Sequence, residues 1–288
     1  MKVKKAVFPV AGLGIRFLPV TKAQPKEMLP LVDKPMIQYA VEEAIAAGIF
    51  EFVMVTGRGK RAIEDHFDHS FELEEMLKAK GKTDLLAEVE KISAKGDFIY
   101  IRQKKPLGLG HAVLCAKPIV CNEPFAVFLP DEIVQGPSPE IGHLLKIFEE
   151  KQCSVIALMK SPREELSRYG IIKPKGDIAS GVFEIEDLVE KPSPQEAPSD
   201  LAIDGRYILT PEIFACLEQS EAGAGGELQL TDGIRKLLQK QKVYGCVLQG
   251  NRLDAGEKLG FLQANITLAL EREDLKEDLK KFLKELKI

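Results

Sequence analysis

The chain of 288 residues is long enough to bury roughly three quarters of the surface of its unfolded form, so a stable core requires neither a disulfide nor a structural metal. Hydrophobic residues make up 45% and charged residues 29%, which is ordinary for a globular domain and excludes a disordered or fibrous chain. The formal net charge of -4 provides no broad positive field, so we expect neither nucleic acid nor an anionic membrane as a partner.

Two further features of the sequence bear on where the protein works. No uncharged apolar stretch approaches the roughly 18 residues of a membrane span, and the N-terminal residues lack the apolar core of a signal peptide. The five cysteines form no Cys-x-x-Cys pair and mostly lie within apolar runs, as buried thiols do. We therefore expect a cytoplasmic protein.

Short apolar runs of strand length alternate with stretches of helical periodicity along most of the chain. The expected strands are 7–10, 52–56, 98–101, 125–129, 154–158, 202–209 and 244–248. The expected helices are 35–48, 61–67, 111–117, 141–150, 232–240 and 257–273. This alternation predicts an α/β fold with a mainly parallel sheet flanked by helices, and such sheets bind ligands at the carboxyl ends of their strands.

Three segments depart from this alternation. Residues 70–95 have the polar helical pattern of a hairpin inserted between strands, and residues 160–200 predict an irregular or antiparallel excursion. The tail from Thr267 to Ile288 predicts one charged amphipathic helix. Its apolar face would pack either on its own domain or on a second subunit.

A glycine-rich loop follows the first expected strand. Gly12 and Gly14 allow backbone N–H groups to approach an anion, and Arg16 and Lys26 would supply cations for a polyphosphate. Phe17 occupies the position of the third glycine of a dinucleotide-binding fingerprint, and no Gly-Lys-Ser or Gly-Lys-Thr follows, so both common nucleotide motifs are excluded. From spacing alone, a tight turn with surface cations explains the loop equally well.

The run from Ala6 to Gln38 resembles the signature of sugar-phosphate nucleotidylyltransferases, most closely the branch that uses UTP and glucose 1-phosphate. The resemblance continues in order to about Ala269, through Gln103, Gly108-Leu109-Gly110-His111-Ala112, Leu129-Pro130-Asp131, Tyr169-Gly170, Val189-Glu190-Lys191-Pro192, Gly205-Arg206-Tyr207, Glu227-Leu228-Gln229-Leu230-Thr231-Asp232 and Asp254-Ala255-Gly256.

This resemblance implies a Rossmann-like nucleotidyltransferase (GT-A-like) fold with a mainly parallel mixed sheet. It implies a catalytic domain over residues 1–270, with 70–95 as a helical insertion and 160–200 on the sugar-phosphate side, followed by a C-terminal amphipathic helix over 271–288. The implied reaction joins UTP and glucose 1-phosphate into UDP-glucose and pyrophosphate with Mg²⁺ as cofactor. A homodimer or homotetramer is expected by the same analogy.

The implied chemistry needs few protein groups. The nucleophile is an oxygen of the sugar phosphate, which is largely dianionic at pH 7 because the second pKa of a phosphate monoester is about 6, so no protein base is required. Catalysis then consists of aligning two anions and neutralising their repulsion with a metal and cations.

The resemblance also assigns individual residues. The catalytic residues would be Arg16, Lys26, Asp131 and Lys191, of which Arg16 and Lys26 serve the triphosphate and Lys191 the sugar phosphate. Nucleotide binding falls to Ala11, Gly12, Gly14, Glu27, Gln103 and Gly108. Sugar-phosphate binding falls to Gly170, Glu190 and Lys191, and the metal ligands would be Asp131 and Asp254.

The residue pattern alone supports some of these assigned roles better than others. Asp131 follows the expected strand 125–129 and offers the hard carboxylate that Mg²⁺ prefers. A loop cap explains Asp254 about as well as a metal site does. For Glu190 with Lys191, spacing alone favours an exposed ion pair. His111 could either cap its helix or approach the nucleotide.

Ile15 departs from the family, which commonly has threonine at this place in the phosphate loop. This departure keeps a non-catalytic regulatory relative open as an alternative to uridylyl transfer. A sister enzyme that uses another nucleotide such as dTTP is a second alternative, and the insertion over 70–95 and the context of Glu27 and Gln103 favour the uridylyl branch over it. We expect an active enzyme, because the other expected catalytic and metal-binding residues are all retained: Arg16, Lys26, Asp131, Lys191 and Asp254.

Overall fold

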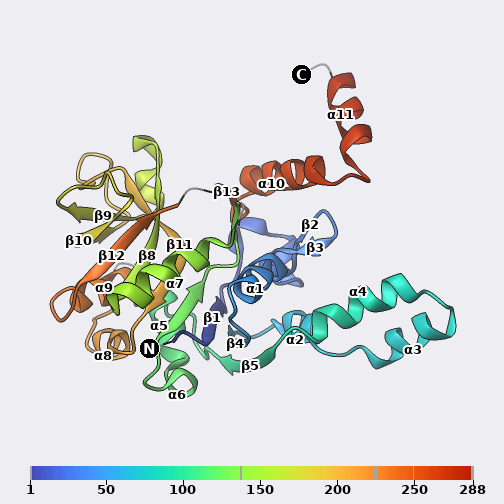
Figure 1. The fold of residues 1–288 in the computed structure, drawn as a ribbon, viewed down its shortest axis with the longest axis horizontal. Coiled ribbons are helices and arrows are strands. Elements are labelled where there is room, and N and C mark those ends of the chain that lie inside the picture. The colour runs from blue at the N-terminus through green and yellow to red at the C-terminus, as the bar shows by residue number, and fades with distance from the viewer. Residues whose placement is uncertain (1, 137, 224–225, 249, 287–288) are drawn as a thin grey trace.

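The computed structural model describes residues 2–136, 138–223, 226–248 and 250–286 (Figure 1). Its centre is a mixed sheet with the strand order β5-β4-β1-β6-β11-β8-β12-β10-β9. The strands of this sheet are β1 (Lys5–Val10), β4 (Glu51–Thr56), β5 (Asp97–Arg102), β6 (Phe125–Phe128), β8 (Ser154–Lys160), β9 (Gly170–Lys175), β10 (Val182–Glu190), β11 (Leu201–Leu209) and β12 (Val243–Val247).

The sheet is parallel in its first half and mixed in its second. Strands β5, β4, β1 and β6 are parallel to one another, and β8 is parallel to β12. Strand β11 runs antiparallel between β6 and β8, while β9 and β10 form an antiparallel pair at the edge. The expected α/β fold is therefore confirmed with a mixed sheet, and the excursion over 160–200 contains antiparallel strands.

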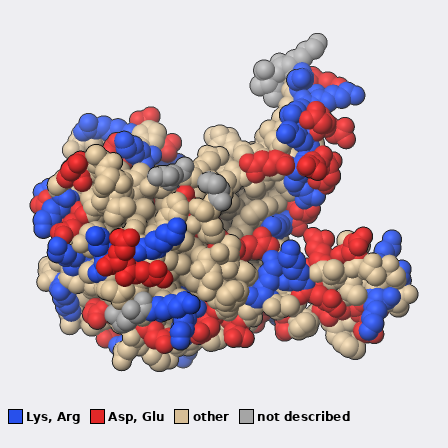
Figure 2. Space-filling model, in the orientation of Figure 1, with Lys and Arg blue, Asp and Glu red and all other residues tan. Residues whose placement is uncertain are grey.

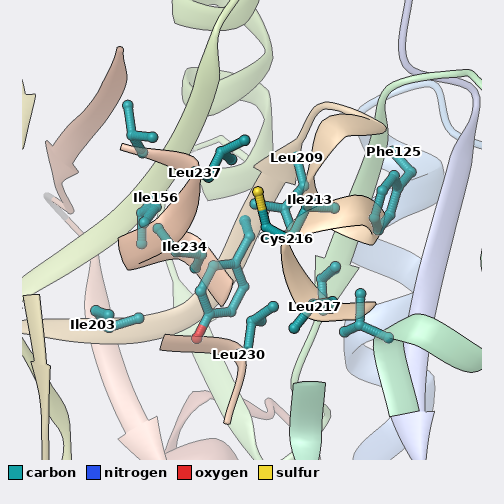
Figure 3. Packing of buried hydrophobic residues seen from close by; sticks show 14 of the residues in the cluster. Phe125, Ile156, Ile203, Leu209, Ile213, Cys216, Leu217, Leu230, Ile234 and Leu237 are labelled. Atoms are coloured by element: carbon teal, nitrogen blue, oxygen red, sulfur yellow. The ribbon is translucent and has the colours of Figure 1, made fainter. Parts of the chain in front are cut away.

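Helices cover both faces of the sheet because successive side chains of each strand point to opposite sides. Val7 of β1 belongs to one core and Phe8 to the other. The Val7 side is covered by α5 (Leu109–Cys115), α8 (Glu212–Glu218) and α9 (Leu230–Leu237). Figure 3 shows apolar side chains of α8 and α9 packed beside those of the strands. The Phe8 side is covered by α1 (Met36–Ala46), α2 (Arg61–Phe67) and α7 (Glu140–Lys151).

The insertion over 70–95 is a helical hairpin, as the fold prediction required. Helix α3 (Phe71–Ala79) and helix α4 (Thr83–Ser93) pack on each other and project away from the sheet (Figure 1). Leu77 of α3 is buried, whereas Phe71 is 71% exposed. On the face shown in Figure 2, basic and acidic side chains are interspersed over the body, the hairpin and the C-terminal helix.

The C-terminal region is not the single helix that the sequence predicts over 267–288. Helix α10 (Lys258–Glu271) ends at Arg272, whose backbone is extended, and α11 (Lys276–Glu285) starts as a separate helix. Helix α11 has no buried residue and extends from the body (Figure 1), so its apolar face does not pack on the domain. Residues 287–288 lie outside the described residues.

Shorter elements complete the chain. Helix α10 rests on a ribbon of β7 (Glu132–Gln135) and β13 (Asn251–Asp254). The remaining elements are η1 (Ile15–Phe17), η2 (Val20–Lys22), η3 (Lys26–Met28), β2 (Pro30–Leu31), β3 (Lys34–Pro35), α6 (Lys117–Val120) and η4 (Arg163–Arg168). Among the described helices, none combines the length and the apolar character that crossing a membrane would need.

Candidate active site

Two cavities adjoin at the edge of the sheet where β1, β5 and β6 end. The first cavity has a volume of about 440 Å³, and the second has a volume of about 280 Å³. Both are lined by Asp131, which follows β6, and by Leu129. A ligand that fills both cavities would therefore pass directly over the Asp131 carboxylate.

The predicted site residues divide between these cavities. The first cavity is lined by Ala11, Gly12, Gly14, Lys26, Gln103, Gly108 and Asp131. The second is lined by Arg16, Asp131, Gly170, Glu190, Lys191 and Asp254. Of the residues predicted from the sequence, Glu27 lines neither cavity.

The glycine-rich loop forms one wall of the first cavity. Gly14 has a φ of 65°, a left-handed conformation that glycine adopts readily, and the Thr21 hydroxyl donates a hydrogen bond to its carbonyl over 2.8 Å. A Cβ at Gly14 would lie only 3.1 Å from the Cβ of Lys26. The glycine thus lets the loop close against the segment that carries Lys26. Ile15 lines the cavity with a side chain that is 69% exposed.

Gln103 forms the opposite wall, directly after β5. Its backbone N–H donates to the Thr56 carbonyl over 2.8 Å, which extends the β4–β5 pairing by one step. Its side chain is almost buried, and Nε2 donates to the Gly108 carbonyl over 3.1 Å. Gly108 has a φ of 96°, and a Cβ there would lie 2.7 Å from the Leu228 carbonyl oxygen, so only glycine fits.

The floor between the cavities is an ion pair. The Lys26 Nζ atom lies 2.5 Å from Asp131 Oδ2, and both side chains are about four-fifths buried. Burial alone would lower the pKa of Lys26, but the charges of Asp131 and Glu27 outweigh it and raise this pKa. Burial also opposes ionisation of Asp131, yet Lys26 lowers the pKa of this carboxyl. Both groups are therefore charged at neutral pH.

Glu27 lies beneath the loop rather than in a cavity. Its side chain is 1% exposed and accepts a hydrogen bond from Lys60 Nζ over 2.7 Å, while Oε1 has no partner within the described residues. Burial raises the pKa of Glu27 against the opposing charges of Lys60 and Lys26. Sequence reasoning missed Lys60, although a cation in a glycine-containing loop after a strand was a usable signal.

A second carboxylate approaches Asp131 from β13. The Gly256 N–H donates to Asp254 Oδ1 over 2.9 Å, which fixes the orientation of this carboxylate. A Cβ at Gly256 would lie 2.9 Å from Asp131 Oδ2 and 3.1 Å from Asp254 Oδ1, so the two carboxylates flank one point. Two such oxygens suit Mg²⁺, which takes one or two carboxylates together with phosphates and water. No cluster of three or more metal-ligating side chains occurs in the described part of the chain.

The second cavity presents a carboxylate and a cation side by side. Thr231, at the start of α9, donates its hydroxyl to Glu190 Oε2 over 2.6 Å. A Cβ at Gly170 would lie 3.3 Å from the same oxygen, so glycine leaves the carboxylate accessible. The Lys191 side chain is 54% exposed with Nζ 3.5 Å from Glu190 Oε1, so it is free to reach an anion.

Two arginines flank the second cavity near Asp254. The predicted Arg16 is largely exposed, and its guanidinium lies 3.8 Å from Glu257. Arg168, which the sequence analysis did not single out, lies 2.9 Å from Asp254 Oδ2 and rests over the Tyr169 ring. Arg168 also lies 3.2 Å from the Glu257 oxygen that Arg16 approaches, so the two arginines form one cationic group beside Asp254.

A buried charge network supports the carboxylates from below. Arg252 hydrogen-bonds Asp204 over 3.2 Å and lies 2.5 Å from Glu132 in an ion pair. Burial raises the pKa of Glu132 to about 8. The charge of Arg252 opposes this shift, and the charges of Asp204 and Asp254 add to it. Arg252 and Asp254 stand two residues apart on β13, where side chains share a face, and this spacing was the available sequence signal.

Comparisons with known proteins identify the family of this chain. A family model described as nucleotidyl transferase matches residues 5–271, and the chain belongs to this family. Among its relatives, the UTP--glucose-1-phosphate uridylyltransferase of Bacillus subtilis (strain 168) is 52% identical over 282 residues, which are 98% of this chain and 96% of the relative.

Solved structures of UDP-glucose pyrophosphorylases have a similar fold. A UTP-bound UGPase from Acinetobacter baumannii matches with a TM-score of 0.91 and 41% identity over 99% of both chains. A UDP-glucose pyrophosphorylase complexed with UDP-glucose matches with a TM-score of 0.86 and 42% identity, over 94% of this chain and all of the other.

Proposed function

We propose that this chain transfers the uridylyl group of UTP to glucose 1-phosphate and releases pyrophosphate, with UDP-glucose as the product. The observation that carries this proposal is the junction of two chemically different cavities over the Lys26–Asp131 pair. One offers a glycine-rich loop and an amide, which suit a nucleotide, and the other offers Glu190 and Lys191, which suit a sugar phosphate. Relatives about half identical over the full chain carry the name of this activity.

In this proposal UTP occupies the first cavity. The uracil faces Gln103 and Gly108, and the backbone at Ala11 and Gly12 borders the nucleoside. The loop at Gly14 follows the triphosphate, whose charge is balanced by Arg16 and Lys26. Glu27 has an indirect role, because its buried contact with Lys60 fixes the short helix η3 that carries Lys26.

Glucose 1-phosphate occupies the second cavity. Glu190, held by Thr231, accepts hydrogen bonds from glucose hydroxyls beside Gly170, and Lys191 binds the phosphate. The dianionic phosphate attacks the α-phosphorus without a protein base, since its second pKa is about 6. Lys26 offsets the charge that accumulates on the α-phosphate, and its raised pKa keeps it protonated while it does so.

Asp131 and Asp254 are the residues that would hold Mg²⁺. When bound, the metal would supply positive charge between two mutually repelling phosphates. The convergence of both carboxylates over Gly256 supports this assignment.

The proposal extends to the assembly and location of the protein. The exposed α11 supports a homodimer or homotetramer, because Phe282 is 55% exposed on an amphipathic helix that has no buried residue. All five cysteines are free, and thiols are kept reduced in the cytoplasm, where we place the reaction.

Pyrophosphate release by the purified protein tests the proposal. With Mg²⁺ and glucose 1-phosphate present, we expect turnover with UTP well above that with dTTP, ATP, CTP or GTP, and none after metal chelation. A preference for dTTP would identify a sister enzyme instead. Binding of UDP-glucose without turnover of any nucleotide would establish the regulatory alternative. The next variant to assay would then be Ile15→Thr.

A further inference from the structure

A histidine outside both cavities contacts the amide of Gln103. His111 is the third residue of α5, and its Nδ1 atom lies 2.9 Å from Gln103 Nε2. The same Nε2 group donates to the Gly108 carbonyl over 3.1 Å. Both amide hydrogens are thereby engaged, and Oε1 makes no hydrogen bond within the described part of the chain. Because Gln103 lines the first cavity, Oε1 is the atom that remains for a ligand.

The contacts of His111 fix its tautomer. Two groups that can donate, Gln103 Nε2 and the thiol of Cys115 at 3.8 Å, face the same Nδ1 atom. A proton on Nδ1 would face the amide hydrogens, so Nδ1 is the acceptor and the neutral ring carries its proton on Nε2. A reversed Gln103 amide would set Oε1 against the Gly108 carbonyl oxygen, where two acceptors repel. Gly108 and His111 therefore impose the same orientation.

We infer that His111 is a positioning residue for base selection, which makes Gln103 present only a carbonyl oxygen to the nucleobase. This inference rests on the proposed uridylyl transfer and specifies how its first cavity recognises the base. Uracil carries a hydrogen on N3 that Oε1 accepts, whereas cytosine carries a lone pair there that Oε1 repels. Thymine has the same N3–H as uracil, so this device rejects CTP but does not separate dTTP from UTP.

The test compares His111→Leu with His111→Asn. Leucine removes the acceptor, whereas the asparagine Oδ1 can occupy the place of Nδ1. We expect the ratio of kcat/KM for UTP to that for CTP to fall about tenfold in His111→Leu, the order of one hydrogen bond, and to recover in His111→Asn. The KM for glucose 1-phosphate should stay constant. An equal loss for UTP and CTP in His111→Leu, with the ratio unchanged, would overturn the inference.

A measurement on the unmodified protein covers the case in which His111→Leu does not fold. The ¹⁵N shifts of the His111 ring near pH 8 should show a hydrogen on Nε2 and a bare Nδ1, and a hydrogen on Nδ1 would overturn the inference. The outcomes also separate the two proposals. A protein that turns over no nucleotide refutes uridylyl transfer, whereas a protein that uses UTP with an Nδ1–H histidine refutes only the role of His111.

Discussion

Replacement of Asp131 by asparagine should separate catalysis from stability. The substitution keeps the size of the side chain but leaves the Lys26 ammonium without its partner at 2.5 Å. Removing one member of a fully buried ion pair costs 3–5 kcal/mol, and the partial exposure of this pair reduces the expected loss to about 2 kcal/mol. Domains of this kind have a free energy of unfolding on the order of 5–15 kcal/mol, so the variant should remain folded.

The rate should respond far more strongly than the stability. Asp131 holds the proposed metal and orients Lys26, so its loss should lower kcat on the order of 10³-fold, as for removal of a group that stabilises a developing charge. Urea denaturation gives the unfolding free energy, and pyrophosphate release gives the rate. Asp84→Asn on the exposed face of α4 is the matched control and should change neither quantity.

The double variant Lys26→Gln with Asp131→Asn tests whether the loss of stability comes from the unpaired Lys26 ammonium. Because it leaves no unpaired charge, it should recover more than half of the lost stability while remaining inactive. An Asp131→Asn variant with near-normal turnover at saturating Mg²⁺ would refute the site. A double variant less stable than either single variant would refute the account of the ion pair.

Three further outcomes follow from the contacts. Thr231→Val removes the hydroxyl that holds Glu190, so it should raise the KM for glucose 1-phosphate about tenfold and leave the KM for UTP unchanged. The control Thr231→Ser keeps the hydroxyl and should behave as wild type. Equal changes in both KM values would argue against a role of Thr231 in positioning Glu190. Burial opposes ionisation of Glu42, but Lys34 and Lys95 lower its pKa to about 2. Its charge therefore stabilises the fold above pH 4.5, and this stabilisation is lost as the pH falls toward 2. In urea titrations Glu42→Gln should cost about 2 kcal/mol at pH 7 and progressively less below pH 4.5, so a constant cost would contradict the assignment. Chelation of Mg²⁺ should abolish turnover but not calorimetric binding of UDP-glucose, and loss of both would show that the metal organises the pocket.

The parts of the site that follow strands were predictable from the sequence. An apolar run of strand length fixes where a strand ends, and the ends of β1, β5 and β6 bring the glycine-rich loop, Gln103 and Asp131 to one edge. The colinear resemblance supplied the second cavity, whose strands β9 and β10 were expected only as an irregular or antiparallel excursion.

Contacts between distant segments were not predictable. The pairing of β7 with β13 joins two four-residue strands that are more than a hundred residues apart, and neither was expected. Arg252 therefore remained hidden beneath the site. Glu27 illustrates the same limit, since only the fold reveals that a glutamate beside Lys26 is buried against Lys60.

The prediction of one continuous helix at the end of the chain, which rested on apolar periodicity, was wrong. The apolar spacing of the tail continues past Arg272, so it gave no sign that the helix breaks there and that α11 leaves the body. Helical spacing reports which face of a helix is apolar, and it does not report what that face packs against.

The electron density of crystals grown with UDP-glucose and Mg²⁺ would test the central claim most directly. We expect uracil N3 within hydrogen-bond distance of Gln103 Oε1, glucose hydroxyls on Glu190, and the metal between Asp131 and Asp254. A nucleotide bound with its base in the second cavity, or a metal bound away from both carboxylates, would contradict the account.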